Sequence, residues 1–145
     1  MKQKLVFGAE GPISVYEWSK LDLGAMLHRR PVVSLSDESG RPTGISMICM
    51  MPRLILADGV SLSVQASRHS YSSPRDDMGP YTKVEVGFPS ENPPEAWKEF
   101  AEDWDSDPTN TIYSYIPLTM VMLYIGAHGG IDRDATFKDY EFNLR

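Results

Sequence analysis

The sequence contains a single cysteine, Cys49, and no long uninterrupted apolar run. One cysteine excludes a disulfide within the chain and is typical of a protein kept in a reducing compartment. The longest apolar stretch, residues 112–127, is interrupted by Pro117 and by polar residues, whereas a membrane-spanning helix needs about 18 apolar residues. Residues 1–12 lack the apolar core of a signal peptide. We therefore expect a cytoplasmic protein that does not interact with membranes.

The motifs that common catalytic and cofactor sites require are also missing. There is no G-x-S-x-G nucleophile turn and no glycine-rich phosphate-binding loop. One cysteine and three scattered histidines do not form a zinc-binding pattern, and Cys49 lies in an apolar stretch typical of a buried side chain. Asp103, Asp105 and Asp107 alternate as in a calcium-binding loop, but Pro108 occupies the position that requires glycine. We expect no enzymatic activity, no metal and no cofactor.

Acidic residues are concentrated in one part of the chain. Twenty acidic and fourteen basic residues give a net charge of −6. Residues 91–107, called the acidic segment below, contain Lys98 and enough acidic residues to account for that whole excess: Glu91, Glu95, Glu99, Glu102, Asp103, Asp105 and Asp107. Such a segment repels nucleic acid and attracts basic protein surfaces, including those that hold nucleic acid. It is predicted to bind a partner protein with a basic surface, and the alternative is a face that only aids solubility.

The first third of the chain has the pattern of a strand, a helix and a hairpin. In chain order these elements are predicted at residues 4–7, 15–27, 32–37 and 45–50. Ser14 and Glu17 begin the helix as a capping box. Pro52 marks a boundary, and the methionines just before it could also be alternative translation starts: Met47, Met50 and Met51. Residues 1–51 are expected to form a βαββ-like segment, which could be a separate unit.

The remainder, residues 52–145, has the pattern of a mainly antiparallel sheet with short helices. Strands are predicted at residues 54–57, 60–67, 83–88 and 111–116, and helices at residues 93–104 and 118–128. Asp58-Gly59 is a strong hairpin signal, and Gly129-Gly130 is typical of a helix end. We expect an α+β fold with two or three short helices packed on one face of the sheet.

The loop at residues 68–82 carries the second candidate site. Its basic and aromatic side chains could bind an anion such as a phosphate: Arg68, His69, Tyr71, Arg75 and Tyr81. Asp76 and Asp77 oppose this, and a loop that only bonds its own backbone is the alternative.

Other histidines and tyrosines have simpler expected roles. His28 and His128 are predicted at the C-terminal ends of helices, where a cation is stabilising. Tyr113 and Tyr115 are expected on one face of a strand, either as an outward contact patch or as part of the core.

Residues 54–131 resemble small proteins encoded by bacteriophages and prophages. The resemblance rests on Ser63-Val-Gln-Ala-Ser67, Tyr71, Ser73-Pro-Arg75, residues 79–90 (GPYTKVEVGFPS), Tyr113-Ser-Tyr-Ile-Pro117 and His128-Gly-Gly-Ile131. It implies an accessory protein in the host bacterial cytoplasm that disables a host defence component, as anti-CRISPR proteins do. The function expected first is stoichiometric, non-enzymatic inhibition through the acidic segment. The alternative is sequestration of a nucleotide immune signal by the loop at residues 68–82, at the interface of a homo-oligomer.

Overall fold

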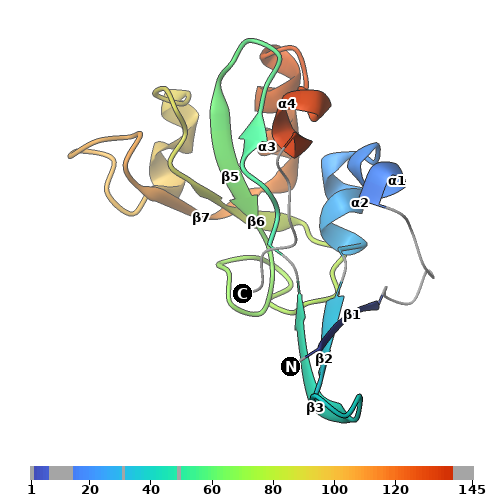
Figure 1. Cartoon of the computed structure of the whole chain (residues 1–145). Coiled ribbons are helices and arrows are strands. Elements are labelled where there is room, and N and C mark those ends of the chain that lie inside the picture. The colour runs from blue at the N-terminus through green and yellow to red at the C-terminus, as the bar shows by residue number, and fades with distance from the viewer. Residues whose placement is uncertain (1, 7–14, 31, 49, 139–145) are drawn as a thin grey trace.

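The computed structural model describes residues 2–6, 15–30, 32–48 and 50–138, which form two antiparallel sheets and several short helices (Figure 1). The first sheet consists, in order, of β1 (Lys2–Val6), β2 (Val32–Ser36) and β3 (Pro42–Ile48). The second consists, in order, of β4 (Leu54–Ile55), β5 (Ser61–Gln65), β6 (Lys83–Gly87) and β7 (Ile112–Pro117). The predicted α+β fold class is confirmed.

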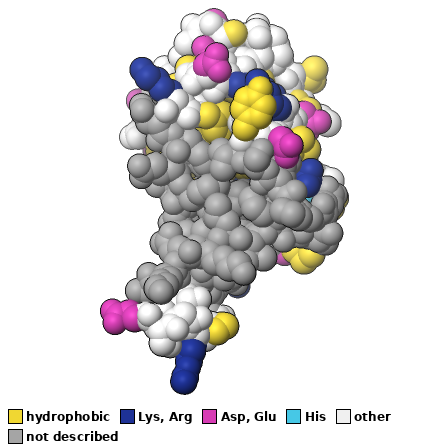
Figure 2. All heavy atoms as spheres, turned by 45° about the vertical axis from the view of Figure 1, so that its right-hand side comes forward, with side chains coloured by type: hydrophobic (Ala, Val, Ile, Leu, Met, Phe, Trp, Pro, Cys, Tyr) yellow, Lys and Arg dark blue, Asp and Glu magenta, His cyan; other side chains and the backbone are white. Residues whose placement is uncertain are grey.

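The predicted hairpin in the first sheet is confirmed. β2 and β3 pair antiparallel, and a carboxylate oxygen of Asp37 accepts hydrogen bonds from the backbone N–H groups of Ser39 and Arg41, at 2.9 and 3.0 Å. The hairpin projects away from the rest of the molecule, and its tip carries charged side chains of both signs (Figure 2). Cys49, expected to be buried, and Ser14, the expected helix cap, lie outside the described residues.

The single helix predicted at residues 15–27 is wrong, because the chain forms two helices there. α1 (Val15–Ser19) ends in a turn, and α2 (Leu23–His28) begins where the Asp22 carboxylate accepts a hydrogen bond from the backbone N–H of Ala25. An aspartate at this position satisfies a donor that a helix start leaves unpaired, and so it favours a new start over continuation. The buried side chains of both helices belong to the same core as the second sheet: Trp18, Leu23, Met26 and Leu27. The division of the chain at residue 51 stays a prediction.

Apolar and polar residues alternate at 60–67 and 83–88, and the second sheet confirms the burial that this predicts except at three positions: Gln65 and Ser67 are buried and Phe88 is exposed. Leu62 and Val64 of β5 are buried, as are Val84 and Val86 of β6, while their neighbours on the strands are mostly more exposed. The turn at Asp58-Gly59 is also as predicted, since the N–H of Gly59, at φ +90°, donates to the carbonyl of Leu56. The two buried faces thus come from strict period-two patterns in the sequence.

The long acidic helix predicted at residues 93–104 is wrong. Only a short 3₁₀ helix, η1 (Glu95–Phe100), forms there. Ala101 adopts an extended conformation and pairs with Tyr113, and the N–H of Glu102 donates to the carbonyl of Ile112 at 2.9 Å. Pairing with the edge of β7 therefore replaces the last helical turns that the spacing of apolar residues predicted.

The helix predicted at residues 118–128 is confirmed as α3 (Leu118–Ala127). Its end is closed by hydrogen bonds from the N–H of Gly129 to the carbonyl of Gly126 and from the N–H of Gly130 to the carbonyl of Ile125. α4 (Arg133–Phe137) follows, and Asp132 caps it. In the described part of the chain no helix has the length and apolarity needed to cross a bilayer.

Tyr113 and Tyr115 do not share a face of β7, contrary to the prediction. Tyr113 is fully buried, whereas Tyr115 is 39% exposed. The pairing of β6 with β7 shifts register between Val84 and Val86, and Tyr115 has a φ of +54°, which turns its side chain out of the regular alternation. The outward patch of two tyrosines expected on this strand is therefore not formed.

Candidate protein-binding site

The acidic segment presents all seven of its carboxylates to solvent. Asp103 and Asp107 also shape the turns of the segment, because they accept hydrogen bonds from the N–H groups of Ser106 and Thr109, at 3.3 and 2.9 Å. The bonds from Thr109 lower the pKa of Asp107 below its ordinary value, with the side-chain hydroxyl bond the largest cause. Three acidic side chains of the segment make no hydrogen bond or ion pair within the described residues: Glu95, Glu99 and Asp105.

A row of aromatic rings packed edge to face or tilted holds this segment against the sheet. Trp97 of η1 packs on Tyr113 of β7 and on Tyr124 of α3, with ring centroids 5.5 and 4.9 Å apart. Trp104 also packs on Tyr113, with ring centroids 6.4 Å apart, and the hydroxyl of Tyr113 donates to the carbonyl of Pro108 at 2.6 Å. These contacts fix a segment that has little regular secondary structure, so its carboxylates are displayed from a defined surface.

An apolar groove of about 560 Å³ lies beside the acidic segment, between η1 and α3. Trp97 and Tyr124, which are 2% and 6% exposed, form its floor, and Leu123, at 75% exposure, stands on its wall. The sequence analysis missed this groove, because it exists only where η1 and α3 are brought together on β7. The one local signal is Leu123, an apolar residue on the exposed side of α3.

One end of the groove carries charge. Nδ1 of His128 donates to a carboxylate oxygen of Asp58 at 2.5 Å, and its Nε2 lies 3.6 Å from an oxygen of Glu91. The hydrogen bond from His128 is the largest cause that lowers the pKa of Asp58. His128 occupies the C-terminal cap of α3, as predicted, and its ring stacks on Tyr124 at 4.4 Å.

Tyr124 also lines the groove, and its hydroxyl is buried and has no hydrogen-bond partner among the described residues. Burial, together with the smaller effects of the negative charges of Glu91 and Asp58, raises the pKa of Tyr124 to about 12. A buried hydroxyl is normally hydrogen-bonded, so Tyr124 brings an unsatisfied polar atom to the lining of the groove.

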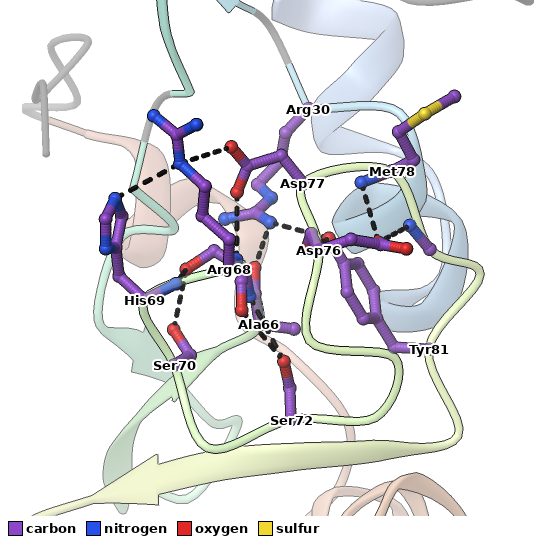
Figure 3. Close-up of polar contacts among 12 residues, drawn as sticks. Arg30, Ala66, Arg68, His69, Ser70, Ser72, Asp76, Asp77, Met78 and Tyr81 are labelled. Carbon is purple, nitrogen blue, oxygen red and sulfur yellow. Dashed lines mark hydrogen bonds and ion pairs between the residues drawn. The ribbon is translucent and has the colours of Figure 1, made fainter.

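The loop at residues 68–82 forms a compact structure whose polar groups bond largely to one another (Figure 3). Nε of Arg68 lies 3.3 Å from a carboxylate oxygen of Asp77 and donates to Nε2 of His69 at 3.2 Å. Tyr81 is buried, its hydroxyl donates to the carbonyl of Asp76 at 2.8 Å, and burial raises its pKa. Inside the loop, the buried guanidinium of Arg30 donates to the carbonyl of Ala66 and to Tyr81.

The five predicted ligand-binding residues of the loop therefore divide into separate groups. Arg68 and His69 contact each other, while the guanidinium of Arg75 lies 5.2 Å from the ring centre of Tyr71. Tyr71 in turn packs against Tyr115, with ring centroids 5.9 Å apart. Of these groups, the one formed by Arg75, Tyr71 and Tyr115 combines exposed aromatic surface with a cation.

His28 and the candidate metal ligands are the last residues considered in the sequence. His28 is the last residue of α2, as predicted, and its Nδ1 lies 2.7 Å from the carbonyl oxygen of Met78. The described residues contain no group of three side chains arranged to hold a metal ion. Comparisons with protein-family models, with curated proteins and with solved structures find no match to this chain.

Proposed function

We propose that this chain is a non-enzymatic binding protein that occupies a basic surface of a partner protein through its acidic segment. The observation that carries the proposal is the exposure of all seven carboxylates of the segment next to an apolar groove. Carboxylates that face solvent attract a basic partner and fix its orientation. An adjoining apolar groove supplies the buried anchor from which most binding free energy comes.

The partner in this proposal is a defence component of a host bacterium, and the chain is a phage or prophage protein that acts in the host cytoplasm. Its support is the resemblance of residues 54–131 to phage-encoded proteins, together with the charge of the acidic segment. Defence proteins that hold nucleic acid have basic grooves, and a carboxylate-rich surface competes for such a groove with the phosphates of the nucleic acid. Inhibition is then stoichiometric, as for anti-CRISPR proteins.

Phage plating tests this proposal in bacterial strains that each carry one defence system, CRISPR–Cas systems included. Expression of the chain should restore plating in a strain whose system it inhibits. The double variant Glu99→Lys/Asp105→Lys should lose this effect, because it reverses two exposed charges that shape no turn. Glu38→Lys/Asp134→Lys, with the same net charge but changed elsewhere, should keep it. The proposal fails if no strain responds, or if both double variants behave as the unaltered chain does.

A second candidate function is the binding of a nucleotide signal by the exposed group of Arg75, Tyr71 and Tyr115. Two tyrosine rings beside a guanidinium can stack on a base and pair with a phosphate. The ion pair of Arg68 with Asp77 weakens this candidate, because it cancels part of the positive charge of the loop. Arg75→Ala should then abolish inhibition while the charge reversals in the acidic segment leave it intact.

A further inference from the structure

We infer that the groove between η1 and α3 binds an arginine side chain of the partner's basic surface. This inference rests on the proposed function and names the contact that anchors it. Three features of the groove support it: its negative end, its apolar walls and its unpaired hydroxyl.

The negative end of the groove favours a cation. The carboxylates of Glu91 and Asp58 both lie at the ring of His128, and both are substantially exposed, at 51% and 45% of their side-chain surface. His128 donates one hydrogen bond to Asp58 at 2.5 Å, whereas its distance to Glu91, at 3.6 Å, is longer than a hydrogen bond. Glu91 therefore retains the capacity to accept hydrogen bonds from a guanidinium.

The walls of the groove favour a long side chain with an apolar stem. Trp97 and Tyr124 provide aromatic surface at its floor, and Met120 and Leu123 provide aliphatic surface along α3. The methylene groups of arginine pack on such surface while the charged end remains at the polar side. A guanidinium is also less strongly hydrated than an ammonium and stacks on aromatic rings, so arginine suits this groove better than lysine does.

The unpaired hydroxyl of Tyr124 is the third feature of the groove. Tyr124 is 94% buried, at 6% exposure, and its oxygen has no partner among the described residues. A guanidinium carries five N–H donors in a planar fork, enough to pair with the Glu91 carboxylate and still donate to a neighbouring hydroxyl. The oxygen itself is buried from solvent, so a guanidinium in the groove pairs with it only where binding shifts the side chains that cover it, and Tyr124→Phe tests whether it does.

A titration followed by NMR tests the inference with the full chain and a capped arginine, Nα-acetyl-arginine methylamide. The readouts are the indole N–H of Trp97 and the methyl groups of Leu123.

Capped citrulline, which has nearly the same shape without the charge, should bind about tenfold more weakly. Glu91→Gln should weaken arginine binding by a similar factor, and Tyr124→Phe should weaken it about threefold. Glu99→Gln is the matched control, since it removes one carboxylate of the acidic segment that does not line the groove, and it should change binding by less than about twofold.

Two results would overturn the inference. Citrulline could bind as tightly as arginine, or the shifts could occur only around Glu99 and Asp105 and be insensitive to Tyr124→Phe. Phage plating judges the proposed function separately. A chain that restores plating but whose groove does not distinguish arginine from citrulline retains the proposed function and lacks this anchor. A groove that selects arginine in a chain without any effect on plating retains the anchor, and the proposed function fails.

Discussion

The unpaired hydroxyl of Tyr124 leads to a prediction about stability. Tyr124→Phe removes one oxygen and keeps the ring that packs on Trp97 and His128. A buried polar group without a hydrogen bond costs about 1–3 kcal/mol. The substitution should therefore increase the free energy of unfolding by about 1 kcal/mol, because it removes this cost without opening a large cavity. This gain would raise the melting temperature by about 3 °C in a domain of this size.

Tyr113→Phe is the matched control, because it makes the same chemical change where the hydroxyl is bonded. The Tyr113 hydroxyl donates to the carbonyl of Pro108 at 2.6 Å, so its loss should decrease the free energy of unfolding by about 1 kcal/mol. Urea unfolding followed by tryptophan fluorescence measures both variants, and unchanged m-values would show that only stability has changed. If Tyr124→Phe destabilises the protein as much as Tyr113→Phe does, the hydroxyl of Tyr124 has a partner and the reasoning is refuted.

The ionisation of the same two tyrosines gives a second readout. Burial raises the pKa of both Tyr113 and Tyr124 from 10.0 to about 12. The folded state therefore holds the neutral phenols, and their contribution to stability is present below pH 10 and lost as the pH rises toward 12. Alkaline unfolding should begin at a higher pH in Tyr124→Phe, and the ultraviolet absorbance of phenolate should show one late-titrating tyrosine fewer.

Two further predictions concern the same end of the molecule. The hydrogen bond from His128 lowers the pKa of Asp58, so its contribution to stability is present above the ordinary value of 3.8 and is lost as the pH falls through the folded value. Asp58→Asn should therefore lose less stability in acid than the unaltered chain does. Acid unfolding is measured on both proteins, and curves with the same pH dependence would contradict the prediction. Gly129→Ala should destabilise by about 2 kcal/mol, because φ is +89° and the new Cβ would lie 2.9 Å from Cβ of Ala57. Gly126→Ala is its control in open space within α3 and should be neutral or stabilising in thermal unfolding.

Local patterns predicted much of the fold. Asp58-Gly59 specifies its turn through the positive φ of glycine, and Gly129-Gly130 closes α3 in the same way. The alternation at residues 60–67 predicted the burial of Leu62 and Val64 in β5, because the period of a strand is fixed by its backbone, but not that of Gln65, whose side chain bonds to the backbone of Met51. These features depend on neighbours in the chain, so the sequence alone was sufficient.

Contacts between distant residues decided what the sequence analysis did not predict. The apolar spacing from Ala96 to Trp104 is helical, yet Ala101 pairs with Tyr113 and ends the helix early. The register shift that turns Tyr115 outward is set by pairing with β6. The acidic segment was found from its charge, but the groove beside it combines residues 91–97 with residues 120–128. These two segments are too far apart in the chain for any short sequence pattern to include both.

Native mass spectrometry tests the central claim most directly. The chain is purified without denaturation from a bacterial strain in which its expression restores phage plating, in parallel with the two charge-reversal variants. The account predicts a complex with one host polypeptide at fixed stoichiometry for the unaltered chain and for Glu38→Lys/Asp134→Lys, and its loss for Glu99→Lys/Asp105→Lys. A bound molecule of nucleotide mass, or the same polypeptide on all three chains, would contradict it.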